Sequence, residues 1–155
     1  MKEEFLHYVW QFQLLNTVDL KSIAGDTIQV LKVGDKNTNA GPDFFNGKVK
    51  IGNTVWAGNI EIHINSSDWN NHKHQNDSAY DNVILHVVLN HDREINTTKN
   101  RSLVTLELAK LIDKKIYDRY QRLVGQKRNI PCQSFLPNID EFVISNWQEC
   151  GVGNF

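Results

Sequence analysis

The clearest pattern in the chain is the alternation of apolar and polar residues along 55–64, "VWAGNIEIHI". Successive side chains of a strand point to opposite faces, so Ile60 and Ile62 share one face. Glu61 and His63 share the other. We therefore predict a strand whose apolar face packs in the core and whose second face carries a carboxylate beside an imidazole.

Four other segments have strand character, which gives predicted strands at 27–34, 43–52, 55–64, 82–90 and 101–108. Gly52 followed by Asn53 predicts a tight turn, so the second and third strands form a hairpin. The fourth strand is apolar except for His86. Such a run is typical of a strand that is buried on both faces.

Apolar residues at helical spacing predict helices at 2–15, 109–124 and 138–150. The polar stretch 65–82 predicts a long loop with one helical turn at 77–81. Together these elements predict an α/β (α+β) fold with a mixed central sheet flanked by helices. We expect one domain over 1–130, followed by a linker and short helix over 131–155.

Composition narrows the class of protein. The 155 residues are 40% hydrophobic and 23% charged, which is ordinary for a globular domain. No apolar run is long enough to cross a bilayer, and the N-terminal stretch lacks the features of a secretory signal. We expect a cytoplasmic protein without a membrane partner.

A formal net charge of −1 argues against a whole-molecule nucleic-acid binder. Basic residues nevertheless gather near the predicted helix at 109–124. A solvated helix face is the simplest explanation. The alternative is a contact with the phosphate backbone of DNA or RNA, through Lys110, Lys114, Lys115 and Arg122.

Asp43 opens the hairpin partner of the strand that carries Glu61 and His63. A buried carboxylate is costly unless it meets a metal, a base or a proton. Two carboxylates with a nearby nitrogen form a cage that suits Mg²⁺ or Mn²⁺. We predict that Asp43 and Glu61 bind the ion and that His63 orients or deprotonates water.

Two more histidines follow in "HKHQND", and we expect His72 and His74 at the rim of the same pocket, as further metal ligands. Imidazoles at this spacing also suit Zn²⁺. An alternative zinc site would therefore be built on the histidines, namely His63, His72, His74 and His86, with Asp77 as another candidate for the third ligand beside His72 and His74. His86 by itself is more typical of a core histidine.

Several long strings resemble an uncharacterised bacterial family, domain of unknown function 2851, over about residues 1–147. They are "NAGPDF", "WAGNIEIH", "SSDW", "AYDNVILHVV" and "IPCQSFLP". The resemblance implies no activity. Members of that family are usually longer, so we expect this chain to be an N-terminal fragment or a truncated product.

The order of elements, with Pro42-Asp43 on one strand and Glu61-Ile62-His63 on the next, is more remotely similar to the PD-(D/E)XK nuclease-like superfamily. That resemblance implies a restriction-endonuclease-like αβββ-αβ core in which the Asp and the Glu bind metal. It also implies an acid on the first helix, which Glu3 or Glu4 would supply. His63 stands where the superfamily usually has Lys.

Three functions follow as expectations. The first is a metal-dependent phosphodiesterase or nuclease, a hydrolase that acts on nucleic acid. The second is a zinc-dependent hydrolase or metal-binding domain. The third is a non-catalytic, β-rich recognition module with a binding surface made of Trp56, Trp69 and Tyr80.

Overall fold

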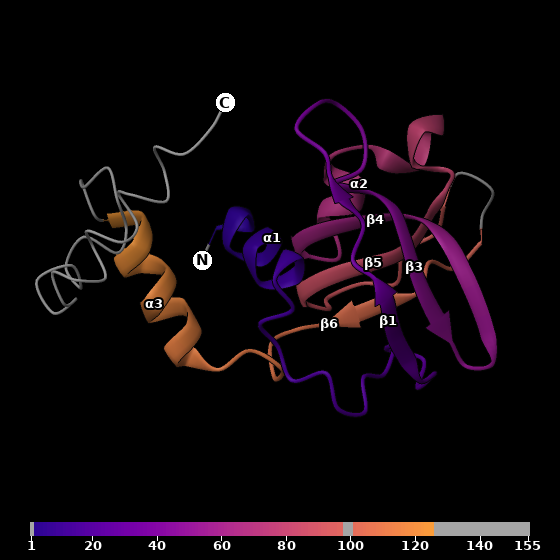
Figure 1. The fold of residues 1–155 in the computed structure, drawn as a ribbon. Coiled ribbons are helices and arrows are strands. Elements are labelled where there is room, and N and C mark those ends of the chain that lie inside the picture. The colour runs from indigo at the N-terminus through magenta and orange to yellow at the C-terminus, as the bar shows by residue number, and fades with distance from the viewer. Residues whose placement is uncertain (1, 98–100, 126–155) are drawn as a thin grey trace, which may run out of the picture. The chain divides into compact units, whose positions relative to one another are not determined.

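A computed structural model describes residues 2–97 and 101–125 of the chain (Figure 1). Its sheet has six strands in the order β1-β3-β4-β5-β6, and β2 pairs with β3 beside β1. The strands are β1 (Ile28–Lys32), β2 (Asp35–Lys36), β3 (Phe44–Ile51), β4 (Thr54–Asn65), β5 (Val83–Asn90) and β6 (Thr105–Glu107). The helices are α1 (Glu3–Gln11), α2 (Asp68–Asn71) and α3 (Lys114–Gly125), with short 3₁₀ turns η1 (His74–Asn76) and η2 (Ser78–Tyr80). This mixed arrangement confirms the predicted fold class.

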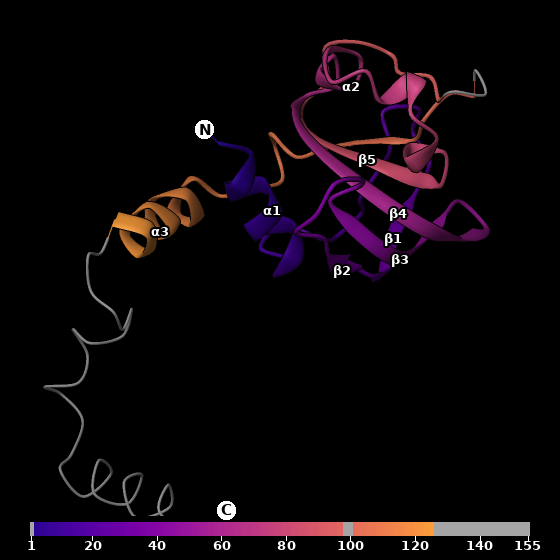
Figure 2. The ribbon, with the colours of Figure 1, turned by 90° about the horizontal axis from the view of Figure 1, so that it is seen from above.

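The predicted hairpin forms between β3 and β4, which pair antiparallel around a turn at Gly52 and Asn53. Gly52 has φ +57°, a backbone conformation that glycine adopts without the steric cost a side chain would bring. The next connection differs, because β5 lies parallel to β4 and β6 lies parallel to β5. A parallel pair needs a crossover, and residues 66–82, with α2, η1 and η2, supply it (Figure 2).

The predicted register of β4 is confirmed at its centre. Ile60 and Ile62 are fully buried, as expected for the core face. Glu61 and His63 on the opposite face are also buried, at 4% and 1% exposure. Helix α1 contacts β4, and the crossover brings histidines against His63. The second face of the sheet is therefore covered, and the polar pair lies inside the protein.

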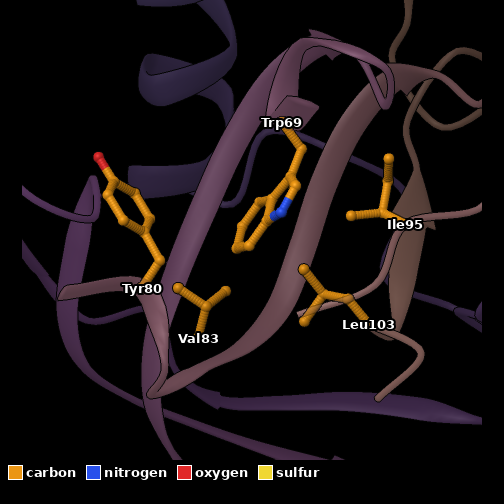
Figure 3. Close-up of a cluster of buried hydrophobic side chains, with 5 residues drawn as sticks. All are labelled: Trp69, Tyr80, Val83, Ile95 and Leu103. Atoms are coloured by element: carbon orange, nitrogen blue, oxygen red, sulfur yellow. The ribbon is translucent and has the colours of Figure 1, made fainter. Parts of the chain in front are cut away.

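The crossover is anchored by a cluster of buried side chains, Trp69, Tyr80, Val83, Ile95 and Leu103 (Figure 3). Trp69 is fully buried and Tyr80 is 8% exposed. The interpretation of Trp69 and Tyr80 as parts of a binding surface is therefore wrong, because both contribute to the core. Trp56 is 41% exposed.

Helix α1 ends at Gln11, so the prediction of a helix through residue 15 is wrong. Gln13 has φ +50°, and its N–H bonds to Trp10 O while the Leu14 N–H bonds to Val9 O. This pair of bonds is the Schellman ending of a helix. A glycine usually occupies the position that Gln13 holds, and its absence hid the helix end in the sequence.

Other predicted bounds also shift. β6 is shorter than 101–108, and α2, η1 and β2 were not predicted. Helix α3 begins at Lys114 instead of residue 109, because the Asp113 carboxylate accepts the N–H of Lys115 and caps the first turn.

Internal contacts divide the chain into two units, at Tyr117 and Asp118. The second unit is described only for 118–125. The predicted helix at 138–150 and the boundary after 130 lie outside the described residues. Within the described part, no helix has the length and apolarity needed to cross a membrane.

Candidate metal centre

The site begins with two carboxylates that interlock across neighbouring strands. The backbone N–H of Asp43 donates to Glu61 Oε2 at 3.1 Å, and the N–H of Ile62 donates to Asp43 Oδ2 at 2.9 Å. Asp43 directly precedes β3, at the end where Phe44 pairs with Ile60. Each carboxylate therefore takes its orientation from the other strand's backbone, and the two acids are held side by side.

The environment of Glu61 disfavours its charge. Burial and the nearby Asp43 carboxylate raise the pKa of Glu61 to about 8, against the lowering effects of the Asp43 N–H bond and of His7. Nitrogens of the His63 and His74 imidazoles lie 3.5 and 3.2 Å from Glu61 Oε1. Burial lowers the pKa of both rings, so they offer Glu61 little compensating positive charge at neutral pH. Glu61 therefore gains free energy from any cation placed beside it.

His63 lies at the centre of a histidine cluster. Its Nδ1 is 2.8 Å from His86 Nε2, and its Nε2 is 3.1 Å from His72 Nδ1. The His74 ring stacks on it, with centroids 5.3 Å apart. Burial, with repulsion from His86, His74 and His72, lowers the pKa of His63 to about 3. His63 is therefore neutral at physiological pH, the form in which imidazole binds metals.

His74 is held by aromatic rings. It stacks on Tyr80 with centroids 3.8 Å apart and meets the edge of Trp69 at 5.4 Å. Its Nε2 is buried and has no hydrogen-bond partner in the described structure, although it lies 3.2 Å from Glu61 Oε1. The two atoms are close, but they are not aligned as donor and acceptor.

A second cluster joins α1 to the hairpin. Ligand atoms of Glu3, His7 and Asp43 all lie within 4.8 Å of one another. His7 Nε2 lies 3.3 Å from Asp43 Oδ2 and likewise makes no aligned hydrogen bond. Burial, followed by the Asp43 charge, raises the pKa of Glu3. Of the two acids considered for this position, Glu3 is in the site and Glu4 is exposed.

Sequence reasoning missed His7. Glu3 and His7 are four residues apart, so a helix places them on one face. That spacing was available in the sequence, but apolar and aromatic residues flank His7 in the helix, and nothing indicated that its face met Asp43.

The structure brings together every predicted residue of the pocket: Asp43, Glu61, His63, His72 and His74. His86 is fully buried behind His63, as expected of a core histidine. Their roles in metal binding and catalysis stay predictions.

The basic residues that were predicted to contact nucleic acid lie in and just before α3. Lys110 is exposed before α3, and the exposed Lys114, Lys115 and Arg122 lie on α3. Arg122 belongs to the second unit. Their proposed contact with phosphate stays a prediction.

Comparison with known proteins bears on the family and not on the activity. The model of a family described as "Protein of unknown function (DUF2851)" matches residues 3–152. No curated protein and no solved structure matches this sequence.

Proposed function

We propose that this chain, which belongs to the DUF2851 family, is a metal-dependent phosphodiesterase that acts on nucleic acid. The observation that carries the proposal is the interlocked pair Asp43 and Glu61, with His63 two residues further along the same strand. Two convergent carboxylates, Glu61 buried and Asp43 half-buried, with few compensating cations form a site for a divalent ion such as Mg²⁺ or Mn²⁺.

The order of elements supports the proposal. A helix, an antiparallel meander of β1, β3 and β4, and a crossover to the parallel β5 agree with the αβββ-αβ core expected from the nuclease-like resemblance. Glu3 would supply the acid that the resemblance implies on the first helix, and it lies with His7 and Asp43 in one cluster.

A bound divalent ion would lower the pKa of a water molecule and stabilise charge on a phosphoryl oxygen. Asp43 and Glu61 would hold that ion. His63 would orient the attacking water rather than deprotonate it, because an imidazole with a pKa of about 3 is a weak base at neutral pH. At the position where the nuclease-like superfamily usually has a Lys cation, this chain thus has the neutral imidazole of His63, which can donate or accept a hydrogen bond.

Nucleic acid is the substrate class that the basic residues favour. Lys110, Lys114 and Lys115 are exposed in the first unit, whereas the chain as a whole has a net charge of −1. Attraction to a polyanion must therefore come from a local basic surface.

The test is cleavage of supercoiled plasmid, single-stranded DNA and RNA by the full chain, with Mg²⁺, Mn²⁺ or chelator. We expect metal-dependent cleavage that Asp43→Asn and Glu61→Gln reduce at least about 100-fold, the scale of losing a metal ligand's charge. Asp19→Asn is the matched control, since Asp19 is an exposed carboxylate paired with Lys21. Equal cleavage by wild type and Glu61→Gln would refute the proposal.

A further inference from the structure

The histidine cluster has more nitrogen donors than the proposed phosphodiesterase needs. We propose that His63, His72 and His74, with Glu61 Oε1, form a separate site for a transition metal of the Zn²⁺ class. Glu61 would then lie between this nitrogen site and the carboxylate site at Glu3, His7 and Asp43. The inference shares two residues with the proposed function, Glu61 and His63. While Zn²⁺ occupies His63 Nε2 and His86 accepts the Nδ1–H, His63 has no nitrogen left to hydrogen-bond a water molecule.

The distances fit direct ligands of a single ion. Zn²⁺ binds nitrogen and oxygen at about 2.0–2.1 Å in tetrahedral geometry, so its ligand atoms lie about 3.4 Å apart. His63 Nε2 lies 3.1 Å from His72 Nδ1 and 3.5 Å from Glu61 Oε1. The third contact, from His74 Nε2 to Glu61 Oε1, is 3.2 Å. The three imidazoles offer nitrogens that all lie within 4.8 Å of one another.

The hydrogen bonds of His63 leave its Nε2 lone pair available to a metal ion. When the Nδ1–H of His63 donates to His86 Nε2, the Nε2 lone pair of His63 faces Glu61 and His72. A ligating histidine usually donates its other N–H in this way. His86 would thus be a positioning residue that fixes the tautomer and ring of His63.

His74 gives an independent indication. A buried imidazole nitrogen usually has a hydrogen-bond partner, but His74 Nε2 is buried and has none within the described residues. It lies 3.2 Å from Glu61 Oε1 without the alignment of a hydrogen bond. Two ligands of one ion show this arrangement, because both point at a third position instead of at each other.

Donor chemistry separates the two sites. Imidazole suits Zn²⁺ and its neighbours in the first transition row, whereas Mg²⁺ takes oxygen ligands. The nitrogen site has three imidazoles and one carboxylate oxygen, whereas the other cluster has two carboxylates and one imidazole. His72 is exposed, so the nitrogen site also has a route by which an ion can enter.

The experiment is calorimetric titration of the chelator-treated full chain with Zn²⁺, and separately with Mn²⁺. We expect tight binding of one Zn²⁺ per chain, weakened at least about 100-fold in His72→Ala and His74→Ala, a larger loss than changes behind the ligands cause. His91→Ala is the matched control, because His91 pairs with Glu94 and is not in the cluster. Asp43→Asn should keep Zn²⁺ binding and lose Mn²⁺ binding.

Circular dichroism of each variant shows whether its fold is retained. Unchanged Zn²⁺ affinity in folded His72→Ala and His74→Ala would overturn the nitrogen site. Mn²⁺-dependent cleavage without Zn²⁺ binding would also overturn it and leave the phosphodiesterase proposal standing. Zn²⁺ binding without nucleic-acid cleavage would support the nitrogen site and count against the phosphodiesterase.

Discussion

His63 on β4 and His86 on β5 face each other across two parallel strands, with Nδ1 and Nε2 2.8 Å apart. Both rings are buried, and the pKa of each is lowered to about 3, first of all by burial. A pair of neutral imidazoles can share only one proton between these nitrogens. The tautomer of His63 is therefore coupled to that of His86.

This coupling predicts the effect of His86→Phe. Phenylalanine, whose ring is somewhat larger than imidazole, fills the space but cannot accept the Nδ1–H of His63, so the orientation of His63 should be less well fixed. We expect Zn²⁺ affinity to fall by about 10–100-fold, the range for losing a hydrogen-bond partner of a metal ligand, while the fold is retained. Calorimetric titration measures the affinity, and an unchanged value would mean that His86 only fills space.

Stability of the metal-free chain should fall as pH rises through the neutral range. Burial holds the folded pKa of Glu61 at about 8 against an ordinary value of 4.5, so the folded state holds a proton that the unfolded state has lost. The contribution of Glu61 to stability is thus fully present below pH 4.5 and is lost as pH rises through about 8. Between about pH 6.5 and 8, His63, His74 and His86 are largely neutral in the folded state because burial lowers their pKa values. Against the lowering effect of burial, contact with Asp43 raises the pKa of His7, so His7 contributes in the same direction as Glu61.

Glu61→Gln isolates this effect. The amide of the variant cannot ionise, so the variant should be more stable than wild type at about pH 8.5 in chelator, by roughly 10–15 °C in Tm. The two proteins should converge near pH 4.5, where Glu61 is largely protonated when folded. Thermal melts across pH measure both. A wild type more stable than Glu61→Gln at high pH would show that Glu61 is ionised and compensated.

The buried histidines act in the opposite direction at low pH. Burial lowers the folded pKa values of His63 and His86 to about 3. Between about pH 6.5 and 3, both imidazoles are therefore protonated in the unfolded chain and neutral in the folded chain. Their contribution to stability is therefore lost as pH falls through this window. Urea unfolding of Glu61→Gln should show the decrease without interference from Glu61, and a flat profile from about pH 6.5 to 4 would contradict it.

Much of the site was predictable because apolar and polar residues alternate along β4 with the period of two that a strand requires. Glu61 and His63 had to share a face once Ile60 and Ile62 entered the core. The hairpin turn then placed Asp43 beside them, at the start of the neighbouring strand.

The sequence did not show how the side chains of the crossover pack against the sheet. Residues 65–82 read as a polar loop, yet Trp69 and Tyr80 fold inward and hold His74 against Glu61. A polar segment gives no periodic signal when its few aromatic residues do the packing. The same limit hid His7, whose partner Asp43 is distant in sequence.

Trp69 should therefore affect both stability and metal binding. Trp69→Ala removes a fully buried ring, which costs about 3–5 kcal/mol in the free energy of unfolding. Because Trp69 also contacts the rings of His74 and His86, the remaining folded protein should bind Zn²⁺ more weakly. Trp69→Phe is the control, since it keeps a buried ring and gives up an Nε1 that has no hydrogen-bond partner in the described structure. Urea unfolding and calorimetry should rank the variants wild type, Trp69→Phe, Trp69→Ala.

The basic residues at the start of α3 give the last prediction. Lys114 and Lys115 are exposed, so charge reversal there should leave the fold intact. If they contact phosphates, Lys114→Glu with Lys115→Glu should weaken DNA or RNA binding for all sequences alike. The slope of log affinity against log salt should fall by about 1.8 for duplex DNA, which is about 0.9 for each lost phosphate contact. Fluorescence anisotropy over a salt series measures that slope.

The control is the same charge reversal at two other lysines, Lys48→Glu with Lys50→Glu on β3. Lys48 is exposed and Lys50 is half-buried. An unchanged slope, with the change at Lys48 and Lys50 reducing it instead, would move the nucleic-acid surface from α3 to the hairpin.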